Sequence, residues 1–325
     1  MGEVVAGIDI GGTKIAIALE TLEGVRVASE RIPTQVEIGP YPIVENVMRI
    51  MEEMIENNHV RLVSIGIGCP GPLDIESGLI LSPSNLPNWN KFPIVELFEK
   101  RFKVPTVLDN DANTATLGEY IYGAGRGYNN LVYITVSTGI GGGIVINGEI
   151  IHGVGAGAGE LGHTIIMPDG IPCKCGSTGC LETICSGLSI ARRAKERLAS
   201  GEPSLLRQLS GHTNEVTTEM VVEAVRKGDK LASEIWAETC HYLAIGIGNM
   251  ITLLAPEAVI IGGGVATAGE LLLKPLRSLL KQYVTMVPME KVAVLQATLG
   301  SESGVCGALV IAKQAYSNSS QVHAK

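Results

Sequence analysis

Two similar glycine-rich stretches constrain the fold of this chain more than any other feature. One covers residues 8–17 (IDIGGTKIAI) and the other covers residues 135–146 (TVSTGIGGGIVI). Each is typical of a β-strand, a tight turn with hydroxyl groups, and a second strand. Glycine permits positive φ angles and close approach to a ligand, and successive N–H groups in such a turn can bind phosphate. A plain hairpin gives the same pattern, but two copies favour a duplicated domain that binds a nucleotide.

The order of expected elements is also similar in the two halves. We expect antiparallel strands at residues 4–10, 15–19 and 25–30, then alternating helices and strands, and the same succession from residue 131 onward. An irregular insertion over residues 153–181 interrupts the second copy. The polar tail from Ser317 is expected to be frayed.

This order predicts two lobes with a boundary near residues 119–125. The smaller N-terminal lobe would hold residues 1–120 and a C-terminal helix at about residues 301–316. The larger C-terminal lobe would hold residues 121–300, including the insertion. We expect the chemistry in the cleft between the lobes.

Composition agrees with a two-domain protein and excludes several partners. The chain has 325 residues, of which 46% are apolar, enough to bury two cores. A net charge of −8 and 4% aromatic residues argue against nucleic-acid binding. No secretory segment is visible, and the longest uncharged stretch, residues 242–255, is too short to span a bilayer. We therefore expect a cytoplasmic protein with no nucleic-acid or membrane partner.

The cysteines predict a metal site. Three of the seven lie within eight residues, which suits a metal in a reducing compartment better than disulfides. Together with one histidine they form a Cys₃His set typical of structural zinc, namely His163, Cys173, Cys175 and Cys180. The other four are expected in the core: Cys69, Cys185, Cys240 and Cys306.

Two further groups of polar residues suggest phosphoryl chemistry. The first turn places Asp9, Thr13 and Lys14 around exposed N–H groups, as needed for a triphosphate and its Mg²⁺ ion. The alternative is a polar hairpin with Lys14 in solvent. Asn110 and Asp111 follow a strand and precede a helix. One interpretation is that Asn110 or Asp111 is the N-cap of this helix. The other is that Asp111 provides the carboxylate that accepts a proton from an attacking hydroxyl.

Two glutamates flank the cysteine cluster. Glu160 lies three residues before His163, so one helical turn would place both on one face. Glu182 follows Cys180 by two residues. Both are either surface glutamates or ligands of a polyol, held in place by the zinc site.

These motifs together resemble the ROK family of sugar kinases and repressors. The resemblance covers nearly the whole chain and rests on residues 9–14 (DIGGTK), 138–143 (TGIGGG), 160–163 (ELGH) and 173–182 (CKCGSTGCLE). It implies an α/β, duplicated actin/hexokinase-like (ribonuclease H-like) ATPase fold of two lobes with an interdomain cleft. It also implies a kinase that phosphorylates the 6-hydroxyl of a hexose, with glucose expected, using ATP and Mg²⁺, and a homodimer or homotetramer.

The resemblance implies a role for each matching residue. Asp111 would be the general base. The sugar-binding residues would be Gly71, Asn85, Asn110, Asp111, Glu160, His163 and Glu182. The nucleotide-binding residues would be Asp9, Gly11, Gly12, Thr13, Lys14, Thr138, Gly139, Gly262, Gly263 and Gly264. Ser137 departs from the leucine or glycine frequent in the family, without expected consequence because backbone groups bind there.

Several alternatives stay open. The hexose could be N-acetylmannosamine, fructose or mannose, and polyphosphate could be a donor. A family repressor would carry a DNA-binding domain before the first turn, for which a first strand at Val4 leaves no room. A third alternative is a non-catalytic sugar sensor. Because the phosphate loops lie elsewhere in the chain, we expect loss of the metal to weaken sugar binding more than nucleotide binding.

Overall fold

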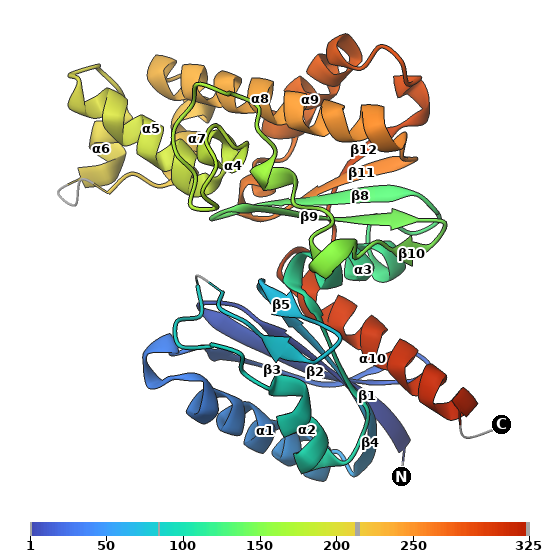
Figure 1. Cartoon of the computed structure of the whole chain (residues 1–325). Helices are drawn as coiled ribbons and strands as arrows, with labels where there is room; N and C mark the ends of the chain where they lie inside the picture. Colours follow the sequence, from blue (N-terminus) through green and yellow to red (C-terminus); the bar gives the residue numbers. More distant parts are fainter. Residues whose placement is uncertain (1, 84, 212–214, 323–325) are drawn as a thin grey trace. The chain divides into compact units, whose positions relative to one another are not determined.

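The computed structural model of the chain describes residues 2–83, 85–211 and 215–322, with side chains to residue 319. The chain forms two compact units, each with its own sheet (Figure 1). Unit 1 comprises Met1–Arg126, Ile150–Ala158 and Ser301–Lys325, and unit 2 comprises Gly127–Glu149 and Gly159–Gly300. No described helix is long and apolar enough to cross a membrane.

The sheet of unit 1 has five strands in the order β3-β2-β1-β4-β7. Its first three strands form the expected antiparallel meander, and β4 and β7 extend it in parallel. The bounds are β1 (Gly2–Ile10), β2 (Lys14–Thr21), β3 (Arg26–Pro33), β4 (Val60–Cys69) and β7 (Thr106–Asn110). A short hairpin, β5 (Leu73–Asp74) and β6 (Leu79–Ile80), follows β4.

Both faces of β1 are buried, because its alternate side chains point to opposite faces and helices cover both. On one face, Val4, Ala6 and Ile8 of β1 belong to a core with α1 (Pro40–Asn57) and α2 (Ile94–Phe102). On the other face, Val5 packs with apolar residues of α10 (Ser303–Val322), which lies beside α3 (Asp111–Tyr122). The helix α10 thus brings the end of the chain back to the first sheet (Figure 1).

The prediction of a frayed tail from Ser317 is wrong over the described residues, because α10 continues to Val322. The hydroxyl groups of Ser317 and Ser319 donate hydrogen bonds to the carbonyl oxygens of Lys313 and Tyr316. Polar residues at this end therefore satisfy their own hydrogen bonds on the helix instead of ending it.

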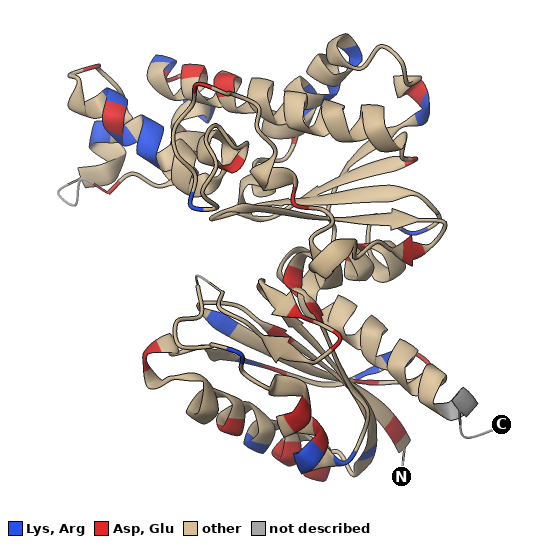
Figure 2. Ribbon diagram, viewed as in Figure 1, with Lys and Arg blue, Asp and Glu red and all other residues tan. Residues whose placement is uncertain are grey.

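The sheet of unit 2 repeats the topology of unit 1. Its order is β10-β9-β8-β11-β12, with β8 and β9 antiparallel and β11 and β12 added in parallel. The bounds are β8 (Leu131–Val136), β9 (Ile140–Ile146), β10 (Glu149–Ile150), β11 (Ala258–Gly262) and β12 (Ala293–Gln296). No charged residue lies in β8, β9, β11 or β12, whereas α5 carries both signs (Figure 2). The shared strand order confirms the duplicated fold.

The described helices of unit 2 lie between β10 and β12 in the chain. The structure has α4 (Glu182–Cys185), α5 (Gly187–Ala199), α6 (Leu206–Ser210), α7 (Thr218–Arg226), α8 (Lys230–Leu254) and α9 (Glu270–Tyr283). Ser186 and Asp229 cap the N-termini of α5 and α8. Leu243, Ala244 and Ile247 of α8 are fully buried, so its uncharged stretch is a core helix, as expected. The four cysteines expected in the core are also buried.

Candidate active site

The turn between β1 and β2 is held by short backbone contacts. The Gly11 N–H donates to the Lys14 carbonyl oxygen over 2.9 Å, and the Gly11 carbonyl accepts from the Thr34 hydroxyl over 2.6 Å. A Cβ on Gly12 would lie 2.9 Å from the Asn85 carbonyl oxygen. The turn therefore brings Asn85 beside the first glycine motif and leaves Lys14 exposed.

Glycine is needed in both turns because other groups of the chain approach its Cα closely, not because φ is positive. Gly11, Gly12 and Gly139 do not have positive φ angles, so that part of the expectation is wrong for them. A Cβ on Gly139 would lie 2.5 Å from a Glu182 carboxylate oxygen. Side chains at these positions would displace polar groups that pack on the turns.

Asp9 and Asp111 interact electrostatically in unit 1. Burial raises the pKa of Asp9 to about 7, and the negative charge of Asp111 adds to the effect, while Lys14 opposes it. A Cβ on Gly304 would lie 2.5 Å from the Asp9 carboxylate, which therefore packs against the first turn of α10. A bound cation would favour the ionised form of both carboxylates.

Gly71, Asn110 and Asp111 come together where β4 and β7 end. Asn110 is the N-cap of α3, because its side-chain oxygen accepts from the N–H groups of Ala112 (2.8 Å) and Asn113 (3.4 Å). The N-cap alternative is thus confirmed for Asn110. Its amide nitrogen would lie 3.4 Å from a Cβ on Gly71. Asp111 is the first residue of α3 and is partly exposed.

Sequence reasoning missed His152, which contacts the strand end next to Asp111. Its Nε2 lies 2.8 Å from Oδ2 of the buried Asp109. The other oxygen of Asp109 accepts from the Asn110 N–H (2.7 Å) and the Asn113 side chain (3.0 Å). Hydrogen bonding to Asp109 raises the pKa of His152. No motif or spacing marks a lone histidine as the partner of a residue 43 positions away.

The second glycine turn, which we call the Ser137–Ile140 loop, is the meeting point of several segments of unit 2. The Ser137 N–H donates to the Gly139 carbonyl (2.8 Å), and the Ser137 carbonyl accepts from the Gly187 N–H (2.7 Å). A Cβ on Gly263 would overlap the Val136 carbonyl oxygen, and Gly263 has a φ of 84°. The turn formed by Gly262, Gly263 and Gly264 therefore packs beside the loop, and Ser137 takes part through its backbone.

Glu160, His163 and Glu182 lie around the same loop. Leu161–His163 forms a 3₁₀ turn in which the His163 N–H donates to the Glu160 carbonyl (3.0 Å), as the spacing predicts. A Cβ on Gly162 would overlap the Ile140 carbonyl oxygen. The N–H group of Ile140 donates to Oε2 of Glu182 over 2.8 Å.

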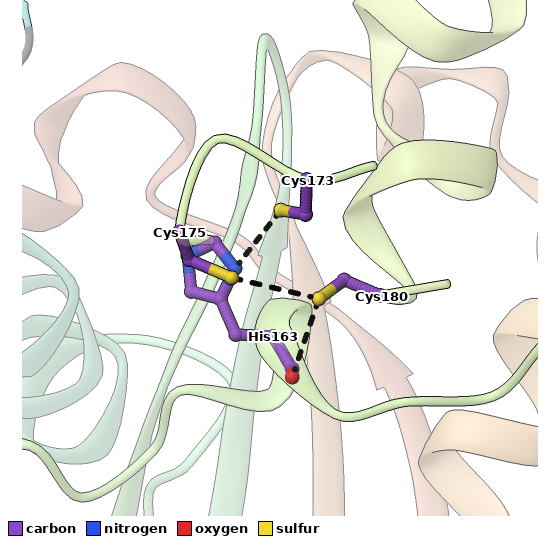
Figure 3. A group of neighbouring side chains, drawn as sticks. All are labelled: His163, Cys173, Cys175 and Cys180. Atoms are coloured by element: carbon purple, nitrogen blue, oxygen red, sulfur yellow. Dashed lines mark hydrogen bonds between the residues drawn. The ribbon is translucent and has the colours of Figure 1, made fainter. Parts of the chain in front are cut away.

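The predicted zinc ligands converge (Figure 3). Their donor atoms all lie within 4.8 Å of one another. The distances are 3.7 Å between the sulfurs of Cys175 and Cys180 and 3.6 Å between the Cys173 sulfur and Nδ1 of His163. Tetrahedral zinc with ordinary bond lengths requires about 3.8 Å between sulfurs and about 3.6 Å between sulfur and nitrogen. The Cys₃His cluster therefore has the spacing that zinc needs.

The cluster leaves Nε2 of His163 directed toward Glu160, whose carboxylate oxygen is 3.9 Å away. Burial raises the pKa of Cys180 to about 12, with the neighbouring sulfurs adding to the shift. A metal ion would have to displace this proton, since thiolates rather than thiols bind zinc.

The structure corrects the premise that both phosphate loops lie apart from the Cys₃His cluster, because the second loop does not. Distance along the chain separates them, but the Ser137–Ile140 loop packs on Gly162 next to His163 and hydrogen bonds to Glu182 next to Cys180. Loss of the metal is therefore expected to disturb this loop as well as the two glutamates.

Comparison with known proteins identifies relatives over nearly the whole chain. Residues 5–315 match the sequence model of the ROK family. A glucokinase of Halalkalibacterium halodurans is 38% identical over 312 residues, 95% of this chain and 94% of that protein. An N-acetylmannosamine kinase of Escherichia fergusonii is 32% identical over 94% of this chain and 97% of its own length.

A solved structure agrees with these relatives. The ROK family glucokinase of Streptomyces griseus, solved in complex with glucose and AMPPNP, superposes with a TM-score of 0.81 at 33% identity. The match covers 96% of this chain and 99% of that one. Sequence and fold are thus shared along nearly the full length.

The His152–Asp109 pair predicts a pH-dependent contribution to stability. Because folding raises the pKa of His152, its contribution is complete below the unfolded value of about 6.5 and is lost as pH rises through the folded value. The side chain of His152 is 36% exposed, so solvent screening limits the effect to about 1 kcal/mol. In urea unfolding, His152→Gln should be less stable than wild type at pH 5.5, with a smaller deficit at pH 9. An equal deficit at both pH values would contradict an ionic pair.

Proposed function

Because this chain belongs to the ROK family, we propose that it is an ATP-dependent kinase that phosphorylates the 6-hydroxyl of glucose. The observation that supports the proposal most is its similarity, over nearly the full length, to the glucokinase of Halalkalibacterium halodurans. The two units are proposed to act as the two lobes of the kinase, close to the lobes expected from the sequence. Such a kinase uses ATP and a hexose of the cytoplasm, where we place it.

We assign the proton transfer to Asp111. A carboxylate that faces the 6-hydroxyl accepts its proton while the oxygen attacks the γ-phosphorus, and ADP leaves. The N-cap bonds of Asn110 hold the start of α3 and so limit how far Asp111 can move. We assign sugar binding to Gly71, Asn85 and Asn110 and also to Glu160, His163 and Glu182.

The two glycine turns are assigned to the nucleotide. Gly11, Gly12, Thr13 and Lys14 offer backbone N–H groups, a hydroxyl and an ammonium group to the phosphates. Thr138 and Gly139 of unit 2 offer backbone N–H groups and a hydroxyl. The Gly262–Gly264 turn is assigned to adenosine. Mg²⁺ bound with ATP supplies neutralising charge on the phosphates, and Asp9 is the carboxylate that would hold it, directly or through water.

We propose that the Cys₃His cluster binds one structural zinc ion. Four protein ligands leave no position for a reacting water molecule, so the metal would have no direct part in the reaction. It would hold His163 through Nδ1, which leaves Nε2 for a sugar hydroxyl.

The second candidate substrate is N-acetylmannosamine, which the similarity to the Escherichia fergusonii kinase favours. Fructose, mannose and a polyphosphate donor belong in the same tests. We further propose a homodimer or homotetramer, to be measured by light scattering.

Enzymatic activity tests the proposal directly. With Mg-ATP, ADP release should rise well above background in the presence of glucose, and less with fructose, mannose and N-acetylmannosamine. A preference for N-acetylmannosamine would show that the chain is a kinase with a substrate other than glucose. If no sugar in the panel stimulates ADP release although glucose binds, the chain is a sugar sensor rather than a kinase.

Asp111→Asn should lower kcat by about 10²–10⁴-fold, because the amide cannot accept the proton. The amide keeps the size of the side chain, so the dissociation constant for glucose should change much less. Asp74→Asn is a matched control, since Asp74 is a carboxylate of unit 1 that hydrogen bonds to the Ser77 N–H. Turnover of Asp111→Asn equal to that of the control would assign Asp111 a purely structural part in α3.

Cys175→Ser should remove the metal. Elemental analysis should find one zinc per chain in the parent and almost none in the variant, and affinity for both glucose and AMPPNP should fall. Cys306→Ala, which changes a buried cysteine of unit 1, should retain the zinc. A zinc-free parent that binds glucose tightly would refute both the ligand set and its influence on the sugar.

A further inference from the structure

Glu182 contacts the nucleotide loop although its assigned role is sugar binding. Its Oε2 accepts a hydrogen bond of 2.8 Å from the Ile140 N–H. A Cβ on Gly139 would lie 2.5 Å from the same oxygen, so the carboxylate rests on the backbone of the loop. Glycine at position 139 is what allows this contact.

The position of Glu182 is itself held on several sides. It is the first residue of α4, two residues after Cys180 of the Cys₃His cluster. Its carbonyl oxygen accepts from the Ser189 hydroxyl over 2.8 Å and from the Ser186 N–H over 3.2 Å. The side chain therefore extends from a fixed backbone to the Ser137–Ile140 loop.

A carboxylate has two oxygens and accepts hydrogen bonds at both. With Oε2 on the Ile140 N–H, the other oxygen is available to a sugar hydroxyl without breaking that bond. A ligand on the second oxygen would restrict rotation of the carboxylate and thereby hold the loop in its bound geometry. The loop would then already be ordered when the nucleotide arrives, which lowers the entropic cost of nucleotide binding.

We propose that Glu182 is a positioning residue that couples sugar binding to the Ser137–Ile140 loop, so that glucose and ATP bind synergistically. This inference rests on the proposed function. Coupling is reciprocal, so ATP should strengthen glucose binding by the same factor.

Glu160 provides a matched comparison within the same unit. It is also a carboxylate assigned to the sugar, but it pairs with His163 at 3.9 Å, and its side chain is 54% exposed. It follows that removal of either carboxylate should weaken glucose, whereas only removal of Glu182 should uncouple the nucleotide.

The test measures the dissociation constant of Mg-AMPPNP by calorimetry, without glucose and at glucose saturating for each variant. In wild type, glucose should tighten AMPPNP by a factor within about 5–150, the range typical of coupled sites. Glu160→Ala should weaken glucose but keep this factor. Glu182→Ala should weaken glucose, reduce the factor to about one, and weaken AMPPNP even without sugar because the Ile140 N–H loses its acceptor.

Glu182→Gln separates positioning from simple structural loss. Its single amide oxygen accepts from the Ile140 N–H, so sugar-free AMPPNP affinity should stay close to wild type. It lacks a second acceptor for the sugar, so the coupling factor should still fall. Zinc content and thermal unfolding check that each variant is folded. If Glu182→Ala does not fold, Glu182→Gln alone tests the coupling.

The outcomes distinguish this inference from the proposed function. If wild type shows the factor and both Glu182 variants keep it, or if wild type binds glucose and AMPPNP independently, the coupling is overturned and the kinase stands. If wild type does not bind glucose at all, the proposed function fails, and the inference fails with it.

Discussion

Backbone-to-backbone packing around the Ser137–Ile140 loop is the contact on which the site in unit 2 depends. The Gly162 segment packs against the Ile140 carbonyl group, and the Glu182 carboxylate accepts a hydrogen bond from the Ile140 N–H. Gly263 packs on the carbonyl group of Val136, where the loop begins. Segments far apart in sequence thus meet at the loop, through backbone contacts at Gly162 and Gly263 and through the side chain of Glu182. Any Cβ at these glycines would have to displace backbone atoms, and overpacking of that kind is costly.

The duplicated topology explains why the residues assigned to the ligands gather at the same end of each sheet. In unit 1, the β1–β2 turn, Gly71 after β4 and Asp111 after β7 follow neighbouring strands. In unit 2, the β8–β9 turn and the Gly262–Gly264 turn after β11 occupy the corresponding places. Ligands of open α/β sheets bind beyond the carboxyl ends of parallel strands. One strand order, used twice, therefore supplies two sets of backbone N–H groups.

Sequence predicted those features that local spacing encodes. The antiparallel meander of β1, β2 and β3 follows from its apolar pattern, and the Cys₃His set follows from ligand type and spacing. Contacts between distant segments were not accessible in this way. His152 gave no signal because its partner Asp109 lies in β7, 43 positions earlier in the chain. The loop was expected to lie apart from the Cys₃His cluster because the two are distant in sequence, and sequence distance does not determine packing. The end of α10 was misjudged because polar composition was taken for fraying.

The central claim is that this chain transfers the γ-phosphoryl group of ATP to the 6-hydroxyl of glucose. The most direct measurement is a ³¹P NMR time course of the protein with Mg-ATP and glucose. The account predicts that the γ-phosphate signal declines while ADP and a glucose 6-phosphate monoester grow in equal amounts. Growth of inorganic phosphate in place of the sugar monoester, or phosphate on another hydroxyl, would contradict it.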